Sequence, residues 1–357
     1  MKHVWTTLAI TAASALSLPL NAATPANGST ESATASAALS TALSSEGWVA
    51  DFDVAVKQAR EQGKNLLVDF TGSDWCGWCI KLDEEVFSHE SWSSVASKEY
   101  IFVSLDFPRS EEAKSKVPNP ERNAALQAKY AVTGFPSILL MTVDGDVFGR
   151  TGYAPGGPEA YLTHMAELKA EGMPKLMEVT KLVTAYEAAE GEARKAAFAT
   201  ILARLEEIGA EGVGSGSLIT AVRAAMDSDA DGSKGIRMPA MKALLGAGVS
   251  DAELLSAAMT ADPKNTEGLY ERVVLVRLQS IKEDTLEDGM ASVAAFDALG
   301  VHQDAAVAFE IYVAGAFFAK QHIKDIDLSR AYAKKGLAIG YEGNPQWTSM
   351  LENMAGE

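Results

Sequence analysis

The residues best suited to chemistry are the only two cysteines of the chain, Cys76 and Cys79, in the segment WCGWC. A strand-like apolar run at 65–70 precedes them, and a helix is predicted to begin at the pair. Two intervening residues in the first turn of a helix let the sulfurs meet as a disulfide, and the helix N-terminus stabilises a thiolate on the first cysteine. Because closing so short a loop stabilises a fold little, we interpret the pair as a redox site rather than a structural crosslink.

A metal site is the alternative use of the two thiols. A tetrahedral zinc site would need two more ligands in addition to Cys76 and Cys79. Besides carboxylates, the candidates are four histidines, no two of which have a paired spacing: His89, His164, His302 and His322. We therefore predict no metal here, and no cofactor elsewhere.

Composition predicts a folded chain with more than one core. The 357 residues are 47% hydrophobic, which suggests about two domains. The formal net charge of −17 argues against a nucleic-acid partner, because a phosphate backbone would be repelled. The same charge makes binding to anionic lipid unfavourable.

The first 22 residues have the pattern of a signal peptide. A weakly positive start is followed by an apolar stretch at 4–20, and Leu20-Asn21-Ala22 is a small-residue cleavage site, so we expect processing after Ala22. Residues 23–45 are mostly Ala, Ser, Thr and Gly and are expected to form a flexible linker. The protein is therefore expected to be exported and periplasmic; an uncleaved N-terminal membrane tether is the alternative.

The chain between 46 and 170 alternates between predicted strands and helices. Apolar runs of strand length predict buried strands, and apolar residues at helical spacing predict helices. Asp144-Gly145-Asp146 is a hairpin turn signal. The pattern predicts an α/β sheet with helices on both faces. The expected strands are 66–70, 101–107, 137–143 and 147–150, and the expected helices are 51–62, 80–87 and 158–168, with a loop leading into a further helix over 118–130.

From 171 to 357 the pattern becomes helical throughout. We expect an irregular all-α domain, because the 34-residue consensus of the tetratricopeptide repeat is not met. A short tetratricopeptide-like solenoid is the alternative. It would either position a partner or support the first domain. The expected helices are 176–189, 192–208, 217–226, 239–245, 251–259, 266–281, 286–298, 303–321, 328–339 and 345–354.

One acidic turn in this part resembles half of a calcium loop. The segment 227–232 (DSDADG) places oxygen ligands at alternate positions and Gly at the sixth. The twelfth position is Met238, where a bidentate carboxylate would be required, and Lys234 adds a positive charge. We interpret the segment as a solvated acidic turn.

Several motifs together resemble the thioredoxin superfamily. They are Val68-Asp69-Phe70, the WCGWC segment, Gly134-Phe135-Pro136-Ser137 before a strand, and the hairpin at 144–145. More narrowly, the segments 69–79 and 105–108 are similar to those of exported bacterial thioredoxin-like proteins, akin to the thiol-donating domain of the membrane disulfide reductase. The resemblance covers about a third of the chain and implies a thioredoxin-like fold for 46–170.

The resemblance implies a role for each cysteine. Cys76 would be the exposed attacking thiolate, and Cys79, one turn further and more buried, would be the resolving thiol. Pro136 would be a cis proline beside the cysteines, where the backbone around Phe135 can pair with a substrate chain. Trp75, with Gly77 and Trp78, would shape the contact surface; an ordinary core aromatic is the alternative for Trp75.

The same resemblance bears on the roles of two acidic residues, Asp69 and Asp74. Asp69 would be the buried proton acceptor for the resolving cysteine, but it stands one residue further from Cys76 than in ordinary thioredoxin. Asp74 could be an exposed acid beside the site, or it could cap the helix that begins near Cys76.

The sequence and the resemblance together predict an exported thiol-disulfide oxidoreductase, with reduction or isomerisation favoured over oxidation. Since the chain holds no third cysteine, the pair must exchange electrons with disulfide- or thiol-containing proteins. A membrane thiol reductase is the electron donor that the resemblance implies. The alternative is a thioredoxin-like scaffold without redox turnover, whose helical domain binds a partner.

Overall fold

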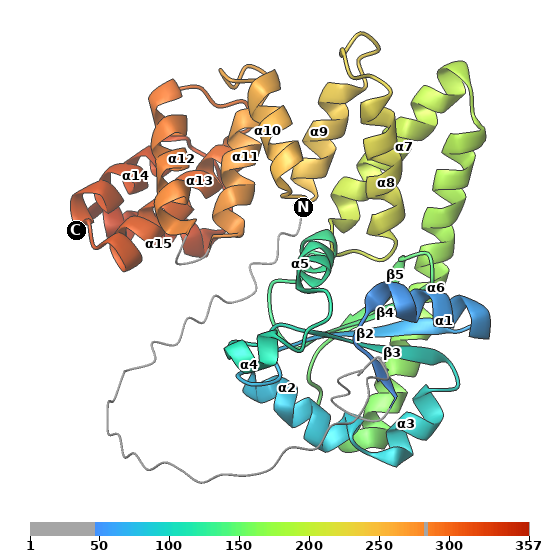
Figure 1. Cartoon of the computed structure of the whole chain (residues 1–357). Coiled ribbons are helices and arrows are strands. Elements are labelled where there is room, and N and C mark those ends of the chain that lie inside the picture. Colours follow the sequence, from blue (N-terminus) through green and yellow to red (C-terminus); the bar gives the residue numbers. More distant parts are fainter. Residues whose placement is uncertain (1–46, 282–284, 357) are drawn as a thin grey trace, which may run out of the picture. The chain divides into compact units, whose positions relative to one another are not determined.

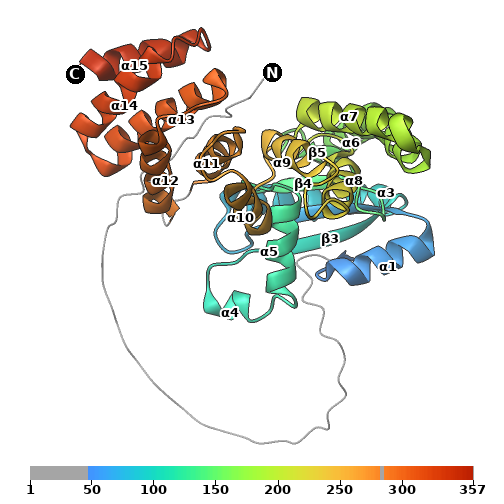
Figure 2. The same ribbon diagram turned by 90° about the horizontal axis from the view of Figure 1, so that it is seen from above.

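The computed structural model describes residues 47–281 and 285–356. The predicted signal peptide at 1–22 and the linker at 23–45 lie outside the described residues. Figure 1 shows a sheet followed by a long series of helices, and Figure 2 shows the same elements from above. Within the described ranges, no helix has both the length and the apolar character that a membrane crossing demands.

The sheet has five strands in the order β1-β3-β2-β4-β5. β2 runs parallel to β3 and antiparallel to β4, while β1 and β5 form the edges. β2 and β3 are almost entirely buried, which explains why both appear in the sequence as apolar runs instead of alternating patterns. The strands are β1 (Trp48–Val49), β2 (Asn65–Thr71), β3 (Tyr100–Asp106), β4 (Ser137–Met141) and β5 (Val147–Thr151).

Helices cover both faces of the sheet and enclose two cores. On one face α1 (Phe52–Gln62) and α5 (Pro120–Lys129) pack on β2 and β3. On the other face the core is built by α3 (Glu90–Ala96), α6 (Gly157–Ala188) and the π-helical turn Asp83–Phe87. This turn directly continues the short helix α2 (Gly77–Leu82); a further short helix, α4, spans Glu111–Lys114. The expected α/β architecture is therefore confirmed.

Three short elements were not predicted from the sequence, and one long helix was predicted as two. β1 and α4 are too short to show periodicity, and α3 is rich in serine, so that none gives a clear pattern. The predicted helices at 158–168 and 176–189 are one helix, α6, which continues through Pro174. Packing explains this continuity, because Gly172 lies so close to the Phe148 carbonyl that a Cβ would be only 1.7 Å from its oxygen. The expected boundary at 170 thus falls inside α6.

The rest of the chain is helical, as expected, and packs around two further cores. The first joins the end of α6 with the helices up to α11, and the second joins α11 with the helices up to α15. α11 belongs to both, because Val273 packs in the first core and Val274 in the second. The helices are α7 (Gly191–Ile208), α8 (Ser215–Asp227), α9 (Arg237–Gly246), α10 (Ala252–Ala261), α11 (Leu269–Gln279), α12 (Leu286–Leu299), α13 (Ala305–Phe318), α14 (Ile326–Ala338) and α15 (Pro345–Gly356), with a π-helical turn at Ala319–Ile323.

The acidic turn that resembles half of a calcium loop has a structural role. Asp229 is fully buried, and its carboxylate accepts the backbone N–H groups of Lys234, Ile236 and Arg237 at 2.8, 2.7 and 3.0 Å. Burial acts to raise the pKa of Asp229, but these N–H groups lower it on balance. The carboxylate therefore organises the turn that leads into α9.

Candidate functional site

The two cysteines lie at the N-terminus of α2 and are joined by a disulfide, with their Cα atoms 5.2 Å apart. Cys76 is the N-cap residue, and its Sγ accepts the backbone N–H of Cys79 at 3.2 Å. We expected Cys76 to be the more exposed of the two, but Cys76 is 6% and Cys79 5% exposed. The disulfide explains this, because it holds the Cys76 sulfur against the first turn of α2. What distinguishes Cys76 is its place at the helix N-terminus, where an N–H points at its sulfur.

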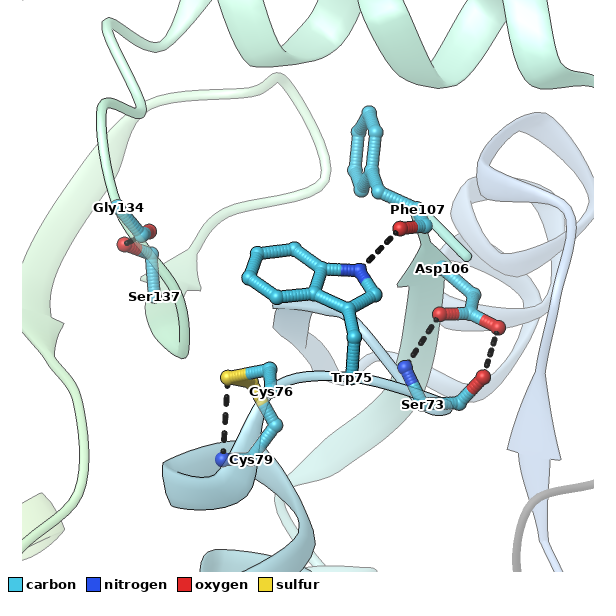
Figure 3. The surroundings of a disulfide bond; sticks show 8 residues. All are labelled: Ser73, Trp75, Cys76, Cys79, Asp106, Phe107, Gly134 and Ser137. Atoms are coloured by element: carbon cyan, nitrogen blue, oxygen red, sulfur yellow. Dashed lines mark hydrogen bonds between the residues drawn. A yellow bond between two sulfur atoms is a disulfide. The ribbon is translucent and has the colours of Figure 1, made fainter. Parts of the chain in front are cut away.

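The Trp75 side chain lies on one side of the disulfide and is fixed there by contacts with other residues. Its indole N–H donates to the Phe107 carbonyl at 2.8 Å, and its ring meets Phe135 edge to face, with centroids 5.7 Å apart. The Arg109 guanidinium lies 4.0 Å from the ring centroid. A Cβ on Gly72 would come within 2.6 Å of the indole, so this close approach requires glycine. Figure 3 shows the indole between the cysteine pair and Phe107.

The loop before Trp75 is tied to the segment after β3 at two points. Ser73 donates its N–H and its hydroxyl to Asp106, at 2.9 and 2.6 Å (Figure 3). Asp74 accepts the backbone N–H groups of Arg109 and Ser110 at 2.9 and 2.8 Å, and these bonds lower the pKa of Asp74 to about 2. The prediction that Asp74 caps α2 was therefore wrong.

The segment before β4 lies on the other side of the cysteines in Figure 3. The peptide bond between Phe135 and Pro136 is cis, which confirms that expectation. The Ser137 hydroxyl donates to the Gly134 carbonyl at 2.7 Å and closes the turn around the proline. Phe135 and Pro136 are half-buried, whereas Gly77 on α2 is exposed.

Asp69 lies in the middle of the sheet, on β2, in register with Ser104 of β3 and Ile138 of β4. It is only 8% exposed, and its Oδ1 atom has no hydrogen-bond partner among the described residues. Burial raises the pKa of Asp69 well above its usual value, and the negative charges of Asp83 and Asp106 raise it further. Asp69 is therefore a buried carboxyl whose surroundings favour its uncharged form.

Sequence reasoning did not single out Asp83, which acts electrostatically on Asp69. It begins the π-helical turn after α2 and is half-buried. Burial, followed by the charge of Glu84, raises its own pKa. Its spacing of four residues from Cys79 could have placed it on the cysteine-facing side of a helix.

The side of the site around Trp78 is open. Trp78 is 58% exposed, and its ring lies 5.0 Å from that of Tyr153, which follows β5. Lys81 lies over both rings. No local motif marks Tyr153, because only the fold brings it to α2.

The described residues contain no group of three or more His, Cys, Asp or Glu side chains that could hold a metal ion.

The sequence of residues 52–169 matches the family model of the thioredoxin-like domain. This segment is a thioredoxin-like domain. Its strand order and its cysteine pair at a helix N-terminus agree with that assignment. The resemblance stated from the sequence motifs is thereby confirmed.

Two curated relatives come from Chlamydia pneumoniae. The disulfide bond reductase DsbH is 34% identical over 111 residues, which are 30% of this chain and 64% of DsbH. The thioredoxin-related protein DsbJ is 25% identical over 95 residues, 27% of each chain. The matches thus span less than two thirds of either relative. A solved DsbH oxidoreductase structure is 30% identical, covering 34% of this chain and 82% of that one, with a TM-score of 0.30.

Proposed function

We propose that this protein is an exported thiol-disulfide oxidoreductase that exchanges the Cys76–Cys79 disulfide with partner proteins. The observation that carries the proposal is the disulfide at the N-terminus of α2, inside a thioredoxin-like domain similar to DsbH. Both sulfurs belong to the only two cysteines of the chain, so the electrons they gain or lose must come from or go to another molecule.

In the reducing direction, the exchange has two steps. The Cys76 thiolate attacks one sulfur of a substrate disulfide, which forms a mixed disulfide and releases the other substrate sulfur as a thiolate. Cys79 then loses its proton and attacks the Cys76 sulfur, which restores the Cys76–Cys79 disulfide and releases the second substrate thiol. The two electrons come from the dithiol, and a dithiol donor must return the pair to its reduced form.

Asp69 is the proposed proton acceptor for Cys79 in the second step. Its support is a buried carboxyl with a raised pKa and an oxygen, Oδ1, that has no partner among the described residues. A carboxylate with a raised pKa is a stronger base than an ordinary aspartate and is better suited to take the Cys79 proton.

The substrate chain is proposed to lie over the residues that border the disulfide. Trp75, Gly77 and Trp78 come from the cysteine segment, and Phe135 and Pro136 come from the turn before β4. Trp75 and Phe135 already contact each other, so the two segments form one continuous surface.

We propose reduction or isomerisation as the physiological direction, because one relative is named a disulfide bond reductase. A membrane thiol reductase is the proposed electron donor. Export rests on the N-terminal pattern of residues 1–22. It is tested by the mass of the mature protein from its native host, which should begin at Ala23; a retained Met1 would overturn the cleavage and favour the membrane tether.

The redox function is tested by reduction of insulin disulfides with dithiothreitol as the electron source. The full chain should accelerate the reaction, while Cys76→Ser and Cys79→Ser should each lose catalytic turnover. Ser88→Ala is the matched control, because Ser88 is exposed at the end of the same helical segment. If the full chain is no faster than Cys76→Ser, the proposal fails.

A further inference from the structure

Two tryptophans lie next to the cysteines in the chain. Trp75 is packed against neighbouring residues, whereas Trp78 is exposed. The Trp75 indole N–H is bonded to a carbonyl, and its ring contacts Phe135 and Arg109. Trp78 is 58% exposed, the largest exposed fraction of any large apolar residue in the part of the chain that the structure describes. Large aromatic side chains left exposed beside a reacting centre are characteristic of contact surfaces.

Tyr153 extends the exposed surface of Trp78. The two rings lie 5.0 Å apart at an interplanar angle of 43°. The Lys81 ammonium group is 5.3 Å from the Trp78 ring centroid and 5.0 Å from that of Tyr153, so it lies over both. The pair is therefore held together before any substrate arrives.

The charged groups beside this aromatic pair neutralise one another. The Tyr153 hydroxyl donates to the Glu85 carboxylate at 2.6 Å, and Lys81 lies 3.7 Å from the same carboxylate. The positive charge of Lys81 and the negative charge of Glu85 thus offset each other beside the rings. The surface offers aromatic carbon without a net charge that could select a charged side chain.

The aromatic pair lies next to the residues over which the substrate chain is proposed to lie. Trp78 stands between the two cysteines in the chain. Tyr153 directly follows Gly152, whose Cα is so close to the Pro136 carbonyl that a Cβ would lie 2.9 Å from its oxygen. The aromatic pair therefore connects the cysteine helix with the turn around Pro136. A polypeptide that brings a sulfur to Cys76 must pass its neighbouring residues across this connection.

We propose that Trp78 and Tyr153 form a subsite for a large apolar side chain of the substrate, adjacent to its reacting cysteine. The proposal rests on the redox function and deepens it, because it assigns a substrate class: disulfides whose flanking sequence is apolar. Trp78 and Tyr153 contact this flanking side chain, and the sulfur chemistry stays with the cysteines.

The test uses peptides in which one cysteine is joined by a disulfide to 2-mercaptoethanol and the residue beside it is Phe, Leu, Ser, Glu or Lys. Dithiothreitol regenerates the dithiol, and kcat/KM is measured for each peptide with the full chain. We expect the Phe and Leu peptides to exceed the Ser peptide about tenfold, with the charged peptides no better than Ser.

Tyr153→Ala should reduce this preference to about twofold or less, and Tyr153→Phe should keep it, because the ring remains while the hydroxyl bond to Glu85 is lost. Trp78→Ala should reduce the preference as well; the ratio between peptides is the readout, because a changed reduction potential affects all of them alike. Met177→Ala is the control, an exposed apolar residue on α6 whose loss should leave the ratio unchanged.

Equal rates for all peptides, or a preference for Glu or Lys, would overturn the subsite while leaving the redox function intact. A persistent apolar preference in Tyr153→Ala would likewise overturn the part assigned to Tyr153. If the full chain reduced none of the peptides, the redox function would fail together with the subsite.

Discussion

Buried carboxyls differ between the thioredoxin-like domain and the helical region. In the sheet, Asp69 is buried with an oxygen that has no partner among the described residues. In the helical region, Asp262 is buried too, but its carboxylate accepts the N–H groups of Thr266, Glu267 and Leu269 and the Thr266 hydroxyl. Paired carboxylates of this kind hold turns together, whereas an unpaired one has its pKa raised and can exchange a proton.

Glu271 is paired as well, but burial raises its pKa and its hydrogen bonds offset this only in part. It is fully buried, and its carboxylate accepts the Asn265 amide and the N–H groups of Gln303 and Asp304. The exception is Glu310 on α13, whose Oε2 atom has no partner among the described residues. Burial, with a smaller contribution from Asp304, raises the pKa of Glu310 to about 7. Carboxyl oxygens without a partner among the described residues thus occur in both regions, at Asp69 and at Glu310.

The largest effect is expected from Asp262→Ala. It leaves three backbone N–H groups in a buried turn without their acceptor, which should lower the free energy of unfolding by about 3 kcal/mol. Urea unfolding followed by circular dichroism measures the change. Asp325→Ala is the control, an exposed N-cap with a single bond to Leu328, and should cost about 1 kcal/mol. Equal losses in the two variants would contradict the structural role of Asp262.

Asp69→Asn is expected to act on the chemistry. With a proton acceptor removed, attack of Cys79 on the mixed disulfide should slow about a hundredfold at pH 7, while the first attack by Cys76 keeps its rate. Rapid-quench single-turnover kinetics would show accumulation of the mixed disulfide. The difference should shrink at high pH, where Cys79 ionises without help. Unchanged resolution at pH 7 would exclude Asp69 as the acceptor.

The same variant tests the raised pKa of Asp69 through stability. A carboxyl whose pKa is higher in the folded state stabilises the fold fully below the unfolded pKa, and this contribution is lost as the pH rises through the folded value. Asp69→Asn should therefore unfold at a higher temperature than the parent chain at pH 8, and the advantage should vanish below about pH 4. A variant less stable than the parent at pH 8 would contradict the unpaired state.

Glu310→Gln should give the smallest change. The pKa of Glu310 is raised to about 7, so its stabilising contribution is present below its unfolded value and lost as the pH rises to about 7. Allowing for its partial exposure, the amide should increase the free energy of unfolding by about 1 kcal/mol at pH 8. Urea titrations at pH 4 and pH 8 measure this increase. If the free energy of unfolding increased equally at both pH values, the increase would come from packing and not from the raised pKa of Glu310.

Local patterns were enough to predict most of the sheet and the core of the site. Strands such as 66–70 are short apolar runs, the helices after 171 have apolar residues at helical spacing, and the cysteine segment and Pro136 have fixed spacing in the thioredoxin pattern. The helices expected at 158–168 and 176–189 are one helix in the structure, because Gly172 packs against β5 and α6 continues through Pro174.

What the sequence did not predict depends on contacts between distant segments. The bonds from Asp74 to Arg109 and Ser110 span 35 and 36 residues, and the Trp78–Tyr153 pair joins α2 to the end of β5. The equal burial of Cys76 and Cys79 follows from the disulfide itself, which no sequence pattern specifies. Tertiary contacts of this kind carry no local signal.

The central claim, that Cys76 attacks and Cys79 resolves, is tested most directly by trapping the mixed disulfide. Reduced Cys79→Ala and Cys76→Ala chains would each be mixed with a peptide disulfide at pH 7, quenched with acid, and analysed by mass spectrometry. The proposed mechanism predicts that Cys79→Ala accumulates a peptide adduct on Cys76, while Cys76→Ala forms far less adduct on Cys79. Equal adducts on the two variants, or none on Cys79→Ala, would contradict it.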